Sequence, residues 1–69
     1  MIKKSILSIL NSLKNVPKEQ WPSSIKLKAV SANSDGLVDS GILSNGVYFY
    51  LKHEFVNGTF TGQCEFVLG

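Results

Sequence analysis

Three dipeptides that end in glycine divide the C-terminal part of the chain at nearly regular intervals: Asp35-Gly36, Asn45-Gly46 and Asn57-Gly58. Each is a preferred sequence for a two-residue type I′ turn, because both central residues of that turn need positive φ. One such pair is weak evidence. Three of them, separated by segments of strand length, predict four antiparallel strands that follow one another in sequence order.

Two-residue turns would also fix which residues of neighbouring strands face each other. Phe55 would face Phe60 across the last turn, Ile42 would face Phe49 across the middle turn, and Ala29 would face Ile42 across the first. Side chains alternate between the two faces of a strand. The three registers agree on one apolar face, formed by Ile25, Leu27, Ala29, Val38, Ile42, Val47, Phe49, Leu51, Phe55, Phe60, Cys64, Phe66 and Leu68.

The first part of the chain carries apolar side chains at alternating spacings of four and three, the period of an amphipathic helix. The stripe comprises Ile2, Ile6, Ile9, Leu13 and Val16, with Leu10 beside it. Pro17 ends the helix, because a residue before proline is pushed out of the α region. The predicted fold class is therefore α+β, with an N-terminal amphipathic helix packed on one face of a four-stranded antiparallel β-meander. It forms a single domain over residues 1–69, with a helix at about 2–15, a connector at 16–23 and the sheet at 24–68.

The composition narrows the classes of function. Of 69 residues, 43% are hydrophobic and 17% are charged, which is typical of a folded domain. The net charge of +2 is too small to indicate a polyanionic partner. A single cysteine excludes an intramolecular disulfide, and a single histidine argues against a metal site. We expect no cofactor, no small-molecule substrate and no enzymatic activity.

The N-terminus does not read as a targeting signal. Lys3 and Lys4 precede an apolar run that is short for a secretory signal and is not followed by a cleavage site of small residues. No segment approaches the length of a membrane span. We therefore expect a cytoplasmic protein without a membrane partner.

Three residues have chemistry that needs an explanation. His53 would lie opposite Gly62, and Cys64 would be offset from it along the sheet, so the two would not form a catalytic pair. Cys64 is then a small apolar filler. Trp21, the only tryptophan, lies in the connector. We interpret it as a plug at one end of the core, with a binding anchor as the alternative.

The other face of the predicted sheet carries both tyrosines and has no second helix to cover it. Gly41 would lie beside Tyr50 and give its ring room, although a glycine inside a strand can also mark a bulge. Asp39 would pair with Lys52 across the strands. Exposed apolar patches often mark contact sites. The predicted protein-binding residues have an apolar centre and a charged rim, and are Tyr48, Tyr50, Leu43, Val67, Lys28, Lys52 and Glu65.

These features predict a small protein-binding module that contacts another protein or its own copy. A domain of this size and architecture is compatible with a stoichiometric inhibitor or antagonist. Contact would occur through the tyrosine face or along the open edge of the last strand, Thr59–Leu68. The alternative is single-stranded nucleic-acid binding, with tyrosines that stack on bases and lysines that follow the backbone. The absence of arginine from the sequence makes this the second choice.

Overall fold

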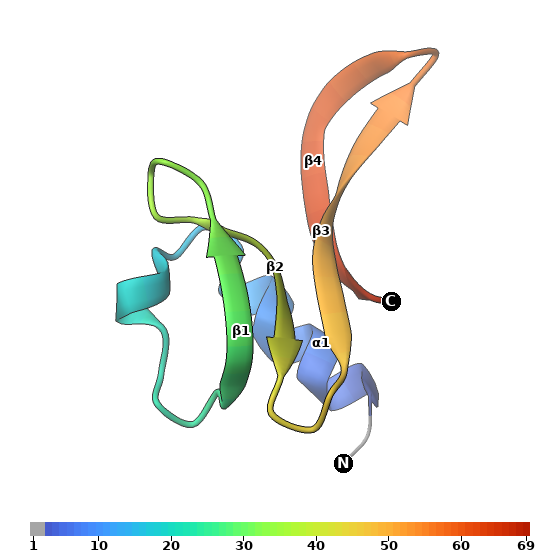
Figure 1. Ribbon diagram of the computed structural model, residues 1–69. Coiled ribbons are helices and arrows are strands. Elements are labelled where there is room, and N and C mark those ends of the chain that lie inside the picture. The colour runs from blue at the N-terminus through green and yellow to red at the C-terminus, as the bar shows by residue number, and fades with distance from the viewer. Residues whose placement is uncertain (1–2) are drawn as a thin grey trace.

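The computed structural model describes residues 3–69, with side chains from residue 5 onward, so the predicted helix position Ile2 lies outside the described residues. One α-helix and one antiparallel sheet of four strands in the order β1-β2-β3-β4 confirm the predicted fold class (Figure 1), and a short 3₁₀ helix lies between them in the sequence. Neither described helix is long and apolar enough to cross a membrane. The elements are α1 (Lys3–Ser12), η1 (Lys18–Gln20), β1 (Leu27–Ala32), β2 (Val38–Leu43), β3 (Tyr48–Val56) and β4 (Thr59–Leu68).

The core is built around two phenylalanines from the hairpin that β3 and β4 form. Phe49 and Phe66 are fully buried and meet edge to face, with ring centroids 5.4 Å apart. Full burial of one such side chain stabilises the fold by about 2–3 kcal/mol. Ile6 and Leu10 of α1 close this cluster, whereas Ile9, predicted for the same stripe, is exposed.

Trp21 belongs to the core, as interpreted from the sequence. Its ring stacks on Phe49 at 6.5 Å and meets the edge of Phe66 at 6.3 Å. Its indole N–H donates a 2.9 Å hydrogen bond to the carbonyl oxygen of Val16, so the polar end of the half-buried ring is also satisfied. This bond fixes the chain just before Pro17. Helix α1 ends at Ser12, earlier than the predicted end at about residue 15.

The predicted pairing of β2 with β3 is wrong by one residue. Gly41, not Ile42, lies opposite Phe49, and Ile42 lies opposite Tyr48. The cause is the middle turn, which has three loop residues: the N–H of Leu43 donates to the carbonyl of Val47 at 2.9 Å. Gly46, at φ +90°, supplies the single left-handed residue that such a loop needs. Since strand side chains alternate, this shift turns Leu43 into the core and Ile42 out of it.

The first turn also has three loop residues, because Asn33 bonds to Leu37. The longer loop shifts the register by one residue, and a bulge in β2 shifts it back. Asp39 is the extra residue of this bulge, and beyond it the partners are the predicted ones, so that Ala29 lies opposite Ile42. Both residues nevertheless lie outside the buried cluster, which corrects their predicted place in the core. Only Asn57-Gly58 forms the predicted two-residue turn, with φ values of 51° and 79°.

The ring of Phe49 occupies the space that Gly41 leaves open. A Cβ atom on Gly41 would lie 2.7 Å from Cζ of Phe49 and 2.9 Å from the carbonyl oxygen of Ala29. The glycine therefore makes room for an aromatic ring, as the sequence suggests, but for the buried Phe49 and not for Tyr50. Any side chain at this position would push the ring out of the core.

Helix α1 caps part of the edge of β4. The side-chain amide of Asn11 accepts a 2.7 Å hydrogen bond from the N–H of Phe66 and donates one of 3.5 Å to the carbonyl of the same residue. The ammonium of Lys14 donates at 2.7 Å to the carbonyl of Cys64. The backbone groups of Phe66 and Cys64 that these side chains bind point away from β3. Without the side chains, they would be free to pair with another strand. The prediction of an open β4 edge is therefore wrong for this stretch.

Replacement of Gly41 by alanine tests the packing against Phe49. We expect Gly41→Ala to lower the free energy of unfolding by about 2 kcal/mol, because an added methyl group in a filled core forces the ring to move. Urea denaturation followed by the fluorescence of Trp21 measures the change. Ser31→Ala, at an exposed site of β1, is the control and should shift stability by less than about 0.5 kcal/mol. Equal stability of the two variants would contradict the packing described here.

Candidate functional site

The β3–β4 hairpin extends far beyond the rest of the sheet (Figure 1). Strand β2 pairs with β3 only from Ser40 to Ile42, which lie opposite Tyr50 to Tyr48. The pairing of β3 with β4 continues to Val56 and Thr59 at the turn. Residues 52–65 therefore form a two-stranded projection, which we call the arm. Because β2 does not reach it, the predicted pairing of Asp39 with Lys52 is wrong, and Lys52 lies opposite Glu65 of β4.

The arm has an apolar face because α1 is too short to cover it. Ten helical residues span about 15 Å, whereas the ten residues of β4 span about 34 Å. Phe49 and Phe66 lie within the core, but Phe55 is 62% exposed and Phe60 is 48% exposed. The sequence placed Phe55 and Phe60 opposite each other, which is confirmed, but predicted them in the core, which is wrong.

The exposed aromatic side chains of the arm contact one another. The rings of His53 and Phe60 meet edge to face at 5.3 Å, and those of Phe55 and Phe60 are tilted at 5.7 Å. We call these three residues the tip cluster. Val56 is also exposed, next to the turn. Cross-strand aromatic contacts hold the two strands in register and give the tip cluster a defined shape.

A bulge in β4 decides what lies at the base of the tip cluster. Glu54 alone lies opposite three residues of β4, 61–63. Gly62 adopts φ +90°, a conformation that other residues rarely take. The hydroxyl of Thr61 donates to Oε1 of Glu54 at 2.8 Å and accepts from the N–H of Gln63 at 3.2 Å. Two extra residues preserve the faces of the strand but change every partner beyond them.

This bulge brings His53 and Cys64 directly opposite each other, which corrects the offset expected from the sequence. Cys64 is a free, half-buried thiol, and His53 is exposed. Among the residues that the structure describes, no cluster of three or more His, Cys, Asp or Glu could hold a metal ion. The pair is a histidine and a thiol on one face of the hairpin.

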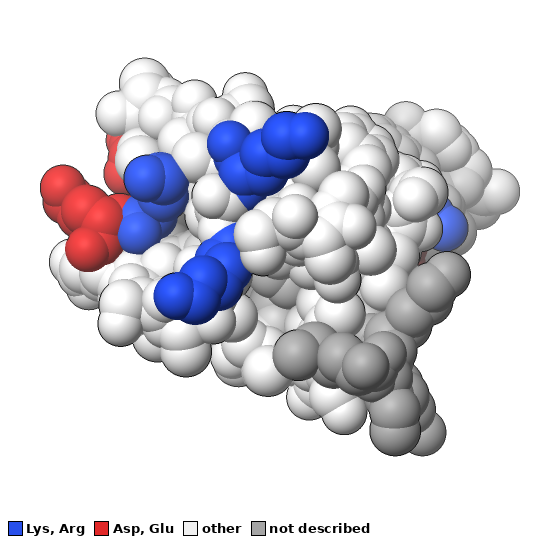
Figure 2. All heavy atoms as spheres, turned by 60° about the horizontal axis from the view of Figure 1, so that its bottom comes forward, with Lys and Arg blue, Asp and Glu red and all other residues white. Residues whose placement is uncertain are grey.

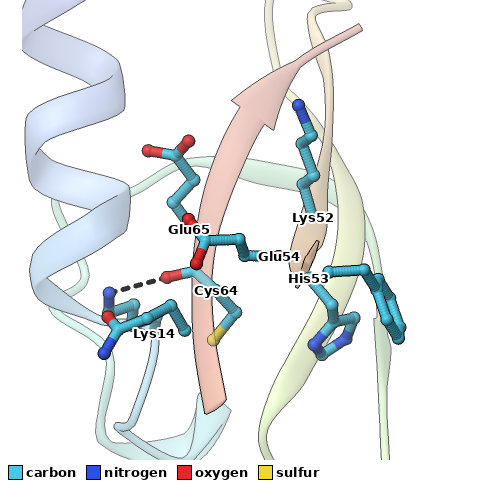
Figure 3. Close-up of a pocket in the computed structure, with 8 residues that line it drawn as sticks. Lys14, Lys52, His53, Glu54, Cys64 and Glu65 are labelled. Atoms are coloured by element: carbon cyan, nitrogen blue, oxygen red, sulfur yellow. Dashed lines mark hydrogen bonds between the residues drawn. The ribbon is translucent and has the colours of Figure 1, made fainter. Parts of the chain in front are cut away.

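An open hollow of about 440 Å³ lies at the base of the arm. Figure 3 shows that the imidazole of His53 and the thiol of Cys64 point to the same side, while the charged ends of Lys52 and Glu65 point away from them. Lys14 reaches in from the end of α1 (Figure 3). The lining residues are Lys14, Lys52, His53, Glu54, Phe55, Gln63, Cys64 and Glu65.

The tyrosine face is present in a modified form. Tyr48 and Tyr50 are both exposed, and their rings stack at 5.9 Å with an angle of 27°. Val67 lies opposite Tyr50, because the observed register of β3 and β4 is shifted by two residues from the predicted one. Leu43 is only 7% exposed and belongs to the core, so its predicted place on this face is wrong. Ile42, opposite Tyr48, takes its place and was missed.

The charged residues predicted for the rim of the tyrosine face lie apart. Lys28 is an extra residue in a bulge of β1 and is exposed. Lys52 and Glu65 lie opposite each other at the base of the arm, and both line the hollow. The structure therefore divides the predicted site between the tyrosine face, here Ile42, Tyr48, Tyr50 and Val67, and the arm.

No family model, curated protein or solved structure matches the chain. The geometry alone must therefore indicate the functional surface. Large apolar side chains that are exposed in the described part of the chain gather on the β3–β4 hairpin. Five of the six lie there, and Ile9 of α1 is the other: the five are Tyr48, Tyr50, Phe55, Val56 and Phe60.

The tip cluster should be dispensable for folding. We expect Phe55→Ser combined with Phe60→Ser to lower the free energy of unfolding by less than about 1 kcal/mol, because exposed cross-strand pairs contribute little. Phe66→Ala should cost about 3 kcal/mol or more, since it opens a cavity in the core. Urea denaturation followed by Trp21 fluorescence compares them. A loss in the double variant as large as that of Phe66→Ala would mean that the arm is part of the core.

Proposed function

We propose that the protein is a non-enzymatic protein-binding module that contacts its partner through the β3–β4 hairpin and acts as a stoichiometric inhibitor or antagonist. The observation that carries the proposal is the concentration of exposed apolar side chains on this hairpin, five of six in the described residues. These side chains form two patches, the stacked Tyr48 and Tyr50 on one face of β3 and the paired Phe55 and Phe60 on the other, and exposed apolar patches commonly mark interaction sites. The proposal thus keeps the tyrosine face and adds the arm to it.

The hairpin has the composition and the rigidity of a binding surface. Phenylalanine and tyrosine are enriched at the centres of interfaces, and each aromatic side chain can bury about 150–250 Å². The rings are held by each other and by the pairing of β3 with β4, which runs from Phe49 to the turn and is interrupted only by the bulge opposite Glu54. A surface that is already ordered loses less conformational entropy on binding.

Nucleic acid fits this surface less well. The rings of Tyr48 and Tyr50 stack on each other, which occupies ring faces that bases would need. Lys52 lies opposite the acidic residue Glu65 in the pairing of β3 with β4. On the face that Figure 2 shows, seen from the bottom of Figure 1, lysines form separate groups on a largely uncharged surface, with acidic residues at one edge. Binding to a phosphate backbone would be favoured by a continuous basic track.

Capture from the native cell extract tests the proposal with three matched variants of the immobilised protein. One carries Phe55→Ser with Phe60→Ser, one carries Tyr48→Ser with Tyr50→Ser, and the control carries Lys18→Ala on the exposed surface of η1. The wild type and the control should retain the same protein in a stoichiometric amount. At least one hairpin variant should lose it, because aromatic residues dominate binding energy.

Two results would contradict the proposal. Equal retention by all variants would place the contact outside the hairpin. Binding of labelled oligonucleotides that falls steeply with salt, and that is lost in the tyrosine variant, would support the nucleic-acid alternative.

A further inference from the structure

We propose that the edge of β3 within the arm, residues 52–56, binds an extended segment of a partner protein, which joins the sheet as a further strand beside β3. In recognition of this kind, the backbone of the partner supplies hydrogen bonds and its alternate side chains supply specificity. This inference rests on the proposed function and states which kind of segment the hairpin receives.

The backbone of β3 is unpaired on one side along the arm. Strand β2 is its neighbour on that side, and it pairs with β3 no further than Ser40 opposite Tyr50. Pairing with β4 on the other side continues to Val56. The arm therefore has β4 along one edge of β3 and no described strand along the other (Figure 1).

The contacts of α1 show which residues of β3 direct their backbone groups to the open side. The N–H and the carbonyl of Phe66 both bind the side chain of Asn11, so both point away from β3. Leu51 lies opposite Phe66, and in an antiparallel pair of this type the backbone groups of both residues point outward. This direction alternates along a strand, so His53 and Phe55 share it with Leu51.

Two further observations agree with this direction. Cys64 lies opposite His53, and its carbonyl also points outward, to the ammonium of Lys14. At the other end of the arm, Val56 flanks the two-residue turn and bonds to β4, which leaves its neighbour Phe55 with the outward direction. The extra residues of the bulge belong to β4. The free backbone groups of β3 are therefore regularly spaced, at every second residue.

The edges of the other strands are interrupted. Strand β1 has a bulge at Lys28. Strand β4 has its bulge at residues 61–63 and the contacts of Asn11 and Lys14 beyond it. Bulges and covering groups are means by which proteins prevent unwanted pairing of an edge. Residues 52–56 of β3 are all exposed and include no proline or glycine, so this edge stays competent to pair.

The side chains beside the edge set the sequence pattern of the partner. His53 and Phe55 lie on the face of the tip cluster, in contact with Phe60. Lys52 and Glu54 lie on the opposite face, because side chains alternate along a strand. An added strand would place every second side chain beside the exposed rings and the intervening ones beside charged groups. We therefore expect a partner segment of about five residues, apolar at alternate positions and polar between them.

Amide hydrogen exchange and a phage-displayed library of random peptides of about eight residues, a typical strand length, provide the test. In the free protein, the N–H groups of His53 and Phe55 should be protected at least about tenfold less than that of Lys52, which faces β4. Peptides selected on the immobilised protein should be apolar at alternate positions, and their binding should protect both edge amides. A library without binders, or binders that leave these amides unprotected, would overturn the inference.

Two substitutions at one position separate the backbone from the side chain. His53→Pro removes an outward N–H, which an unpaired edge tolerates, and should weaken binding of a selected peptide about tenfold. His53→Ala keeps the N–H and should bind within about threefold of the wild type. Equal affinities of the two variants would contradict strand addition. Urea denaturation shows whether the proline variant is folded, and the exchange measurement on the wild type does not depend on that variant.

The outcomes also separate this inference from the proposed function. Capture of a protein that a hairpin variant loses, without protection of the edge amides by peptides, would refute strand addition alone. Protection of His53 and Phe55 in the peptide-free protein, together with the mass of a dimer, would make a second copy the occupant and would refute a partner segment. Loss of both capture and peptide binding would refute the proposed function as well.

Discussion

The contact between the ring of Phe49 and the bare backbone of Gly41 decides how this small sheet is assembled. With only 69 residues, the chain has a single apolar cluster, and Phe49 is at its centre. The ring lies over β2 where any side chain would collide both with it and with the carbonyl of Ala29. A one-residue slip of β2 would put Ile42 in that place and turn Leu43 out to solvent. The contact therefore selects the register, and the register selects which face of β2 is buried.

The length of the elements then determines what is left exposed. Strand β2 ends its pairing at Tyr50, and α1 covers only the near half of the hairpin, so the apolar face of β3 and β4 continues without cover. Asn11 of the same helix, and Lys14 just after its end, occupy the edge of β4. Edge pairing is thus blocked from Cys64 to Phe66, at the base of the arm. The large apolar side chains that stay exposed on the hairpin lie on the arm and on the tyrosine face.

The sequence was sufficient for the fold class, the strand order and the position of every turn, because Asn-Gly and Asp-Gly pairs mark turns reliably. It was insufficient for loop length. Asn45-Gly46 suits both a two-residue turn and a three-residue loop that ends in a left-handed glycine, and the two differ by one residue in register. The bulge at Gly62 adds two residues, so Phe60 and Cys64 keep their face while Cys64 changes its partner from Leu51 to His53. Alternation identified the apolar face of the arm, but a pattern in the sequence does not reveal where the covering helix stops.

Cross-strand nuclear Overhauser effects measure the pairing of β2 with β3 directly. We expect a contact between the α protons of Ile42 and Tyr48, together with contacts from the α protons of Gly41 to the ring of Phe49. The side chain of Leu43, and not that of Ile42, should contact the core residues Leu10 and Phe49. A pattern in which Ile42 lies opposite Phe49, with Leu43 beside Tyr48 on the exposed face, would show that this pairing is wrong.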